Sequence, residues 1–373
     1  MKNPFIIAGE IPQEYFCDRQ EESKLLIRKL TSGENVCLFA PRRIGKSKLI
    51  HYCYSQNPLQ SDYYCFYIDI YHTSTLREFV YSFGQQVFST LKGKSDTMLT
   101  KFVQTLKSIN AQFSYDAQTN MPAFNLSLGD FQRPDYTLEE IFYALEQADK
   151  PCVVCFDEFQ QIAYYTEKNI EALLRGHIQN LKNTHFIFSG SSRHLLQEMF
   201  HSQARPFYNS VSTMKLLPIP LEKYYEFANY WFSKTNKNIP FSIVEHIYTT
   251  MESNTFYLQK TMHELFEETS KGETCTLEQV NQIINKIIDE NRDIYKHLLS
   301  MIPIRQKELL FAIAKDGKAE KIMSSSFIHR HKLISSSAVQ TAMKKLLALD
   351  IITEQDNVFS ISDVLFALYL KEL

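Results

Sequence analysis

The 373-residue sequence lacks the features of membrane and secreted proteins. No segment approaches the roughly 18 consecutive uncharged apolar residues that a membrane-spanning helix needs. Residues 1–10 contain no long apolar stretch, so we expect no secretory signal. The 40 lysines and arginines nearly cancel the 42 aspartates and glutamates, which argues against nucleic acid covering the whole molecule and leaves only local binding. We therefore expect a cytoplasmic protein with no membrane partner.

The sequence also lacks a cysteine framework. Its seven cysteines are scattered singly, except for Cys152 and Cys155. These two are three residues apart in an apolar run typical of a β-strand, so their side chains point to opposite faces. We interpret them as core residues of a protein from a reducing compartment, rather than as a metal-binding or redox pair.

The most informative pattern is a predicted strand, a short loop and a predicted helix in residues 36–54. The strand-forming apolar run stops at Ala40, and the tripeptide Gly-Lys-Ser at 45–47 precedes a helical pattern. This is the signature of a loop that binds phosphate, with Ala40 in place of the first glycine. That position needs a compact residue more than a positive φ angle, so the replacement does not change the interpretation.

The chemistry of phosphate binding assigns a role to each part of this loop. Gly45 keeps a side chain out of the phosphate's way, Lys46 reaches the β and γ oxygens, and the Ser47 hydroxyl can bind Mg²⁺. Backbone N–H groups and the positive end of the helix add to the site. The alternative is a basic turn on a solvated surface. The predicted nucleotide-binding residues are Pro41, Arg42, Arg43, Ile44, Gly45, Lys46, Ser47 and Lys48.

A second motif supplies the acids that such a site needs. The apolar run at 152–156 predicts a buried parallel strand, and it ends in Asp157 and Glu158. We predict that Asp157 holds Mg²⁺ together with Ser47, and that Glu158 is the general base for the attacking water. Taken alone, the two acids could equally be solvated residues at the end of a strand.

A third predicted strand, at 185–189, also runs into small polar residues. Ser191 is our candidate for sensing the γ-phosphate or orienting water, with Ser189 and Ser192 as neighbours that could serve instead. Arg193 and Arg205 are candidates for stabilising the transferred charge. The alternative for both arginines is an ordinary ion pair with a surface carboxylate.

The alternation of strands and helices predicts an α/β fold. Further strands are expected at 64–70 and 216–219, and helical patterns occupy 76–91 and 138–147. Such alternation indicates a mostly parallel sheet with helices on both faces and ligands at the carboxyl ends of the strands.

From residue 221 onward the apolar period becomes helical, with predicted helices at 244–251, 255–268 and 277–288. The end of the chain then predicts a winged helix. Its helices are expected at 306–314, at 324–331 and after a cap at Ser335 or Ser336, followed by two strands at 351–353 and 358–361. The predicted domains are 1–220, 221–300 and 301–373.

The third of these helices has an outward polar face suited to phosphate contacts. Between residues 305 and 350 there are nine lysines and arginines against four acids, an excess of five positive charges. This excess would suit phosphate contacts and docking in a DNA groove, and the alternative is a solvated helix in a module that contacts other protein domains. The face comprises Ser337, Gln340, Thr341, Lys344 and Lys345.

Together these motifs resemble the archaeal-type ATPases of the STAND branch of AAA+-related P-loop proteins. The loop is similar to the family's G-P-R-R-x-G-K-T/S, the run 157–160 matches its acidic motif, and 189–200 looks like its sensor segment. Residues 15–22 resemble the family's F-x-D/G-R-x-x-E segment. The resemblance places the side chains of this segment beside adenine and ribose, and they are Phe16, Asp18, Arg19 and Glu22.

The resemblance also implies a fold and an activity. The fold is a P-loop NTPase domain, then a helical lid bundle that closes over the nucleotide, then a winged-helix domain. The implied cofactors are ATP and Mg²⁺. Many members carry P-L-Y-G-R where this chain has residues 206–210 ending in Ser210, so Arg205 would have to replace the family arginine.

Three functional hypotheses follow. The first is a Mg²⁺-dependent ATPase, with turnover that could be slow, that uses its nucleotide state as a conformational switch. The second is an ATP-regulated DNA-binding protein that acts through the winged helix. The third is a protein–protein scaffold with little hydrolysis. A protein partner or a homo-oligomer is compatible with all three.

Overall fold

Two units make up the chain in this computed structural model, which describes residues 1–373 except 1, 10, 110–113, 116–121, 124–126 and 356. Residues 18–218 form one unit, here called the α/β unit. Residues 1–17 and 219–373 form the other, here called the helical unit. The division of the sequence into three domains stays a prediction.

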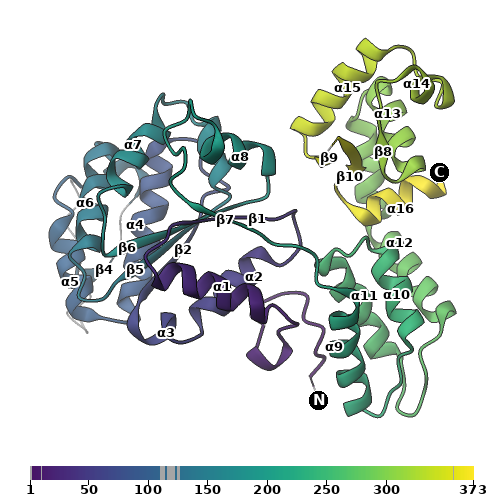
Figure 1. The fold of residues 1–373 in the computed structure, drawn as a ribbon, viewed down its shortest axis with the longest axis horizontal. Coiled ribbons are helices and arrows are strands. Elements are labelled where there is room, and N and C mark those ends of the chain that lie inside the picture. The colour runs from purple at the N-terminus through teal and green to yellow at the C-terminus, as the bar shows by residue number, and fades with distance from the viewer. Residues whose placement is uncertain (1, 10, 110–113, 116–121, 124–126, 356) are drawn as a thin grey trace. The chain divides into compact units, whose positions relative to one another are not determined.

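The α/β unit is built on a five-stranded sheet in the order β2-β5-β6-β1-β7 (Figure 1). Every neighbouring pair is parallel, so the predicted α/β class with a parallel sheet is confirmed. Because the strands are parallel, their carboxyl ends meet at one edge of the sheet. The strands are β1 (Val36–Phe39), β2 (Tyr64–Asp69), β5 (Cys152–Asp157), β6 (Thr184–Gly190) and β7 (Ser212–Lys215).

The position predicted for the last strand, 216–219, is wrong. Strand β7 lies just before it, and only the Leu216 N–H continues the ladder, donating to the Phe39 carbonyl oxygen at 3.1 Å. Pro218 has no N–H to donate, so the ladder cannot extend through it. The apolar run at 216–219 is therefore the exit from the sheet rather than the strand itself.

Two groups of helices cover the sheet. The helices of the first group pack against one another on one side of the sheet and contact β1 and β2. The helices of the second group pack against one another on the opposite side (Figure 1). A short antiparallel pair, β3 (Ser114–Tyr115) with β4 (Pro122–Ala123), joins the second group. The first group is α1 (Gln20–Thr31), α2 (Lys46–Tyr54) and α3 (Leu59–Asp62), and the second is α4 (Leu76–Lys92), α5 (Asp96–Thr105), α6 (Pro134–Glu146) and α7 (Ile170–Ile178).

The core of the α/β unit is rich in phenylalanine, and it fixes β5 and β6. Phe156 of β5 and Phe186 of β6 stack with ring centroids 6.0 Å apart, and both are fully buried. Cys152 and Cys155 are fully buried in β5, as the sequence predicts. The remaining elements of the unit are η2 (Leu128–Asp130), η3 (Phe159–Tyr164) and α8 (Arg193–His201).

The helical unit contains the N-terminal residues as part of its core. Phe5 is fully buried and its ring lies 5.6 to 5.8 Å from the rings of Phe227, Phe232 and Phe266. His263 Nδ1 donates to the Phe5 carbonyl oxygen at 2.8 Å. These contacts explain why residues 1–17 belong to this unit. Its first elements are η1 (Gln13–Tyr15), α9 (Leu221–Lys234), α10 (Phe241–Thr250), α11 (Thr255–Glu268) and α12 (Leu277–Met301).

The end of the helical unit has the winged-helix order of elements, so that prediction is confirmed. The Ser335 hydroxyl caps the third helix by accepting from the Ala338 N–H at 3.2 Å. The sequence missed one strand, β8, which completes a sheet in the order β8-β10-β9. The elements are α13 (Ile304–Asp316), β8 (Ala319–Glu320), α14 (Ser325–Arg330), α15 (Ser336–Ala348), β9 (Ile352–Gln355), β10 (Val358–Ile361) and α16 (Val364–Glu372).

None of the helices in the described ranges is both long enough and apolar enough to cross a membrane.

Candidate active site

The loop between β1 and α2 has the backbone shape that a phosphate site needs. Gly45 caps α2 with φ at +97°, a left-handed conformation that glycine adopts without steric cost. A Cβ built on Gly45 would lie in open space, with no heavy atom within 4 Å. The loop therefore leaves room beside the start of α2, where helix geometry directs N–H groups and partial positive charge.

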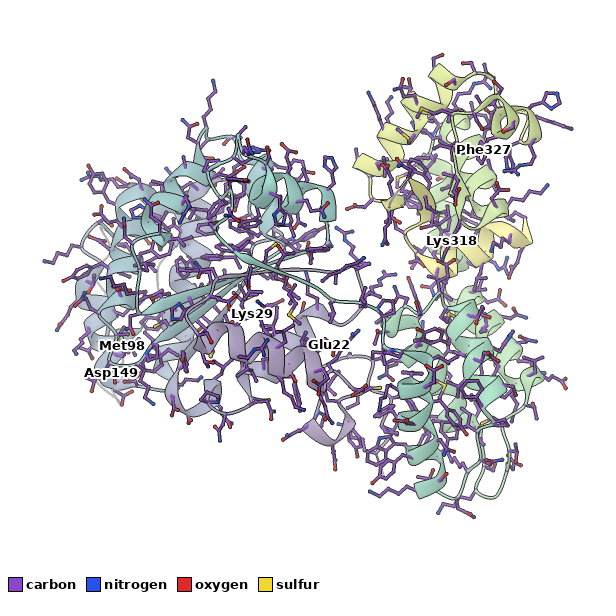
Figure 2. All side chains as sticks on the ribbon, viewed as in Figure 1. Glu22, Lys29, Met98, Asp149, Lys318 and Phe327 are labelled. Atoms are coloured by element: carbon purple, nitrogen blue, oxygen red, sulfur yellow. The ribbon has the colours of Figure 1, made fainter. Side chains whose placement is uncertain are left out.

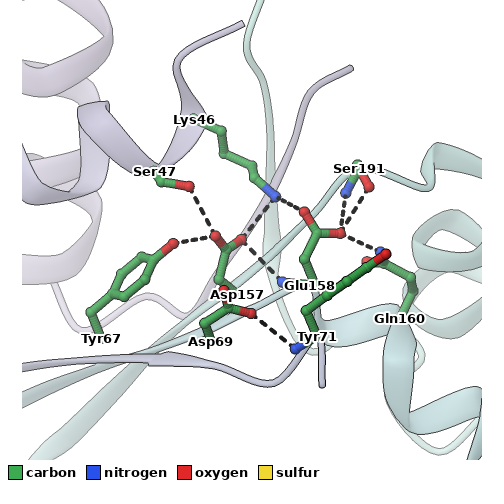
Figure 3. A network of polar contacts seen from close by, with 9 residues as sticks. All are labelled: Lys46, Ser47, Tyr67, Asp69, Tyr71, Asp157, Glu158, Gln160 and Ser191. Carbon is green, nitrogen blue, oxygen red and sulfur yellow. Dashed lines mark hydrogen bonds and ion pairs between the residues drawn. The ribbon is translucent and has the colours of Figure 1, made fainter. Parts of the chain in front are cut away.

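Lys46 joins this loop to the carboxyl end of β5 (Figure 3). Its side chain is only 7% exposed, and Nζ lies 2.8 Å from Asp157 Oδ1 and 3.1 Å from Glu158 Oε1. The first residue of α2 and the last residue of β5 meet because both lie at the carboxyl edge of the parallel sheet. One buried ammonium group thus serves two carboxylates.

Both oxygens of Asp157 are saturated with donors. Oδ1 accepts from the Glu158 N–H at 3.0 Å in addition to Lys46. Oδ2 accepts from the Ser47 hydroxyl at 2.9 Å and from the Tyr67 hydroxyl. The carboxylate is therefore held in one orientation from four directions (Figure 3).

Glu158 is held on its other side by the segment after β6. Its φ is +55°, and Oε2 accepts from the Ser191 hydroxyl at 2.8 Å and from the Gln160 amide at 2.5 Å. Gly190 makes room for Gln160, because a Cβ at Gly190 would lie 2.0 Å from Gln160 Oε1. Gln160 is 6% exposed, and its Oε1 makes no hydrogen bond in the described part of the chain.

The charges at this site stabilise one another. Burial opposes the charged form of Lys46, but Asp157 and Glu158 outweigh it and raise the pKa of the ammonium group. Burial also opposes ionisation of Asp157, yet Lys46 lowers the pKa of that carboxyl to about 2. The pKa of Glu158 is lowered in the same way, against its burial. At neutral pH the site therefore holds one ammonium and two carboxylates.

These residues fit a triphosphate with Mg²⁺. The open space at Gly45, the ammonium of Lys46 and the helix terminus suit phosphate oxygens. The hydroxyl of Ser47 and the carboxylate of Asp157 are oxygen ligands of the kind that Mg²⁺ takes in proteins.

Comparison with known families decides the assignment. Residues 16–261 match the model of a family described as ATPase domains predominantly from Archaea. The chain belongs to this family. Residues 293–372 of the ATPase match a second model, described as a probable winged helix domain. No curated protein matches the sequence.

Solved structures show the same fold at low identity. A Walker-type ATPase of Pyrococcus abyssi is 20% identical with a TM-score of 0.67, covering 99% of each chain. The ORC2 protein of Aeropyrum pernix, in ADPNP–ADP complexes, is 14% identical with a TM-score of 0.61, covering 100% of this chain and 96% of that one. The ORC1 protein of the same organism, in complex with DNA, is 12% identical with a TM-score of 0.51 and the same coverage.

The segment of the ATPase that resembles an adenine site contacts the phosphate loop. Arg19 is 3% exposed, and its guanidinium donates to the carbonyl oxygens of Ile44 at 3.3 Å and Leu217 at 2.6 Å. Glu22 accepts from the same guanidinium at 2.8 Å. Arg19 thus fixes the loop to the exit from β7. Asp18 is the first residue of the α/β unit, whereas Phe16 belongs to the helical unit.

The remaining residues of the predicted loop precede or follow Lys46 in the chain. Pro41, Arg42 and Arg43 are exposed, and the Arg42 guanidinium lies 5.9 Å from the centre of the Tyr71 ring. Ile44 is buried, and Lys48 is half-buried in the first turn of α2.

Of the two predicted arginines, only Arg205 has a side chain that the structure describes. Arg205 donates to Glu171 Oε1 at 3.0 Å and to Glu198 Oε1 at 2.6 Å, and so links α7 to α8. This is the ordinary ion pairing that the sequence left open as an alternative. Arg193 is the first residue of α8, but its side chain lies outside the described part of the structure.

Sequence reasoning missed Tyr67 and gave no individual role to Gln160. Tyr67 lies on β2, two residues before Asp69, and Asp69 pairs in register with Asp157. The strand prediction placed the end of β2 at the carboxyl edge of the sheet. No signal in the sequence, however, showed that β2 lies beside β5.

Proposed function

We propose that this chain is a Mg²⁺-dependent ATPase whose nucleotide state controls a conformational switch, as in the STAND branch of these ATPases. The observation that carries the proposal is Lys46, whose buried ammonium bridges Asp157 and Glu158 beside the open space at Gly45. A cation held by two acids next to an anion-binding helix terminus is poised to exchange partners when a triphosphate arrives.

The chemistry follows from that exchange. Ser47 and Asp157 would hold Mg²⁺, which supplies positive charge to the phosphate oxygens. Lys46 moves its hydrogen bonds to the phosphates and releases Glu158 Oε1. Glu158 is ionised and keeps the Ser191 and Gln160 hydrogen bonds on Oε2, so its free oxygen can accept the proton of the attacking water.

The same exchange supports a switch. Glu158 is tied through Ser191 to the segment that enters α8, and α8 is tied to α7 through Arg205. When Glu158 loses its contact with Lys46, the charge changes at the residue that holds the segment before α8 in place. We propose that α8 and the segment before it respond to the state of the phosphates, and that the helical bundle at 221–300 acts as the lid.

A direct binding measurement tests the proposal. We expect wild-type protein to bind ATP with Mg²⁺, and Lys46→Ala to lose binding because it removes the phosphate ligand. Lys29→Ala is the matched control, since Lys29 makes an ordinary partly exposed ion pair with Glu34 at 3.0 Å. Failure of the wild-type protein to bind ATP at millimolar concentration would disprove the function.

A second proposal is that the winged helix binds DNA under the control of ATP. The predicted outer face of α15 is exposed along its whole length, at positions 337, 340, 341, 344 and 345. Lys344 and Lys345 make no ion pair with any residue that the structure describes. The similar ORC1 protein is in complex with DNA, which supports this use of the fold.

A further inference from the structure

Among the described residues, Tyr67 is the one donor to the Asp157 carboxylate that belongs to none of the nucleotide-binding motifs. Lys46 and Ser47 come from the phosphate loop, and the Glu158 N–H is the next group along the main chain. The Tyr67 hydroxyl comes instead from the neighbouring strand β2 and donates to Oδ2 (Figure 3). Its role has to be inferred from its position.

The position of Tyr67 is fixed from two sides. In the sheet Tyr67 pairs with Cys155, and Asp157 is two residues beyond Cys155, so the side chains of Tyr67 and Asp157 lie on the same face of the sheet. Its ring contacts the ring of His51 on α2, with centroids 4.4 Å apart. A carboxylate oxygen only accepts, so the Tyr67 hydroxyl is the donor in its contact with Asp157.

Of the four donors to the Asp157 carboxylate, Lys46 would leave, and the Glu158 N–H and the hydroxyls of Ser47 and Tyr67 would stay. When Lys46 turns to the phosphates, Oδ1 loses its charged partner. Oδ2 keeps the hydroxyls of Ser47 and Tyr67. Since Ser47 would itself bind Mg²⁺, Tyr67 is the side-chain donor to Asp157 that takes no direct part in holding metal or phosphate.

We propose that Tyr67 is a positioning residue of the magnesium site, whose hydroxyl fixes the Asp157 carboxylate so that its other oxygen faces the metal. This inference rests on the proposed function. Groups that orient a metal ligand without touching the metal commonly change metal affinity 10- to 100-fold, roughly, when they are removed. The effect should therefore appear in the Mg²⁺ dependence of nucleotide binding and not in nucleotide binding as such.

The test compares Tyr67→Phe with a matched control, Tyr54→Phe. Tyr67→Phe keeps the ring that contacts His51 and removes only the hydroxyl. Tyr54 is in the same unit, and its hydroxyl donates to the Phe66 carbonyl oxygen of β2 at 3.2 Å, away from Asp157. A fluorescent non-hydrolysable ATP analogue is bound to each protein, first in EDTA and then during a Mg²⁺ titration. Thermal unfolding, with and without Mg²⁺ and the analogue, checks the fold of every variant.

We expect Tyr67→Phe to raise the half-saturating Mg²⁺ concentration about tenfold, with analogue affinity in EDTA unchanged. Tyr54→Phe should match wild type in both measurements. An unchanged or lower half-saturating concentration in Tyr67→Phe would overturn the inference, and so would equal weakening with and without Mg²⁺, which indicates a merely structural role. If wild type binds the analogue but shows no response to Mg²⁺, the proposed metal dependence itself is wrong.

Discussion

Positive charge is used differently in the α/β unit and in the winged helix. Lys46 is 7% exposed and lies within 3.1 Å of two carboxylates. In the winged helix only two of the nine cations between residues 305 and 350 form ion pairs in the described structure, Arg305 with Glu308 and Arg330 with Asp316. The other seven, all lysines, make no ion pair with a residue that the structure describes, and Figure 2 labels one of them, Lys318. They are Lys307, Lys315, Lys318, Lys321, Lys332, Lys344 and Lys345.

The difference decides how much each region reveals about function. A buried charge must be paired, because removing one partner of a buried pair costs about 3–5 kcal/mol. The two acids that pair with Lys46 therefore indicate one kind of site, in which a buried cation can exchange carboxylate partners for phosphate oxygens. Exposed lysines cost little to leave unpaired, so they fit any anionic partner. The predictions below test this contrast.

The largest effect is expected from Glu158→Gln. The substitution removes the charge that accepts a proton while keeping a side chain of the same size, so ATP binding should persist. Hydrolysis should fall about 10²- to 10⁴-fold, the usual contribution of a general base. Phosphate release at saturating ATP measures it. Equal hydrolysis by wild type and variant would show that another group is the base. The burial and pairing of Glu158 would then not identify it as a catalytic residue.

Gly190→Ala tests the packing that holds Glu158. The new methyl group would lie 2.0 Å from Gln160 Oε1 and 2.9 Å from Leu196 Cδ1, so Gln160 must move. We expect a loss of about 1–3 kcal/mol in the free energy of unfolding, measured by urea denaturation, together with slower hydrolysis. Gly176→Ala is the control, because a Cβ there meets nothing within 4 Å and alanine favours the helix α7.

A wild-type-like stability for Gly190→Ala would mean that the Gln160 side chain moves aside freely. Its hydrogen bond to Glu158 would then not be needed for the fold of this edge of the sheet.

The size of the stability loss at acid pH distinguishes the buried acid from the exposed ones. The pKa of Asp157 is about 2 in the folded protein against 3.8 in its ordinary environment. Its stabilising contribution is therefore complete above pH 3.8 and is lost as the pH falls towards 2. The free energy of unfolding of wild type should fall by about 2 kcal/mol more over this range than that of Asp157→Asn.

Glu308→Gln, which breaks an exposed ion pair with Arg305, is the comparison for the winged helix. It should leave the acid part of the stability profile almost unchanged, since exposed pairs contribute about 0–1 kcal/mol. Identical profiles for wild type and Asp157→Asn would contradict the depressed pKa of Asp157.

The sequence predicted those parts of the site that depend on local motifs. Lys46 follows a predicted strand and a glycine, and Asp157 ends an apolar run. Because the carboxyl ends of parallel strands meet at one edge of the sheet, the two residues could be expected to lie close together. Tyr67 could not be predicted, because its contact depends on β2 lying beside β5. The pairing of Gln160 with Gly190 depends on a close approach between η3 and the end of β6, which no local pattern encodes.

The same limit applies outside the site. Phe5 joins the helical unit through contacts with residues more than 200 positions later in the chain, so local periodicity gave no indication of it. The winged helix was predictable because its cap at Ser335 and its alternating strands are local signals.

The smallest effect is expected from Lys344→Glu with Lys345→Glu, because both side chains are exposed and unpaired in the described structure. If the α15 face contacts DNA phosphates, each lysine lost removes about one counterion-release event. The slope of log affinity against log salt concentration should then become shallower by about two, measured by gel shift at several salt concentrations.

Lys168→Glu with Lys271→Glu makes the same change in net charge at exposed positions outside the winged helix, and it should leave the slope unchanged. Equal slopes for the two double variants would mean that total charge, and not this face, sets the binding. The polar face of α15 would then be better explained as a contact surface for protein. The unpaired lysines of the winged helix would not indicate that it binds nucleic acid.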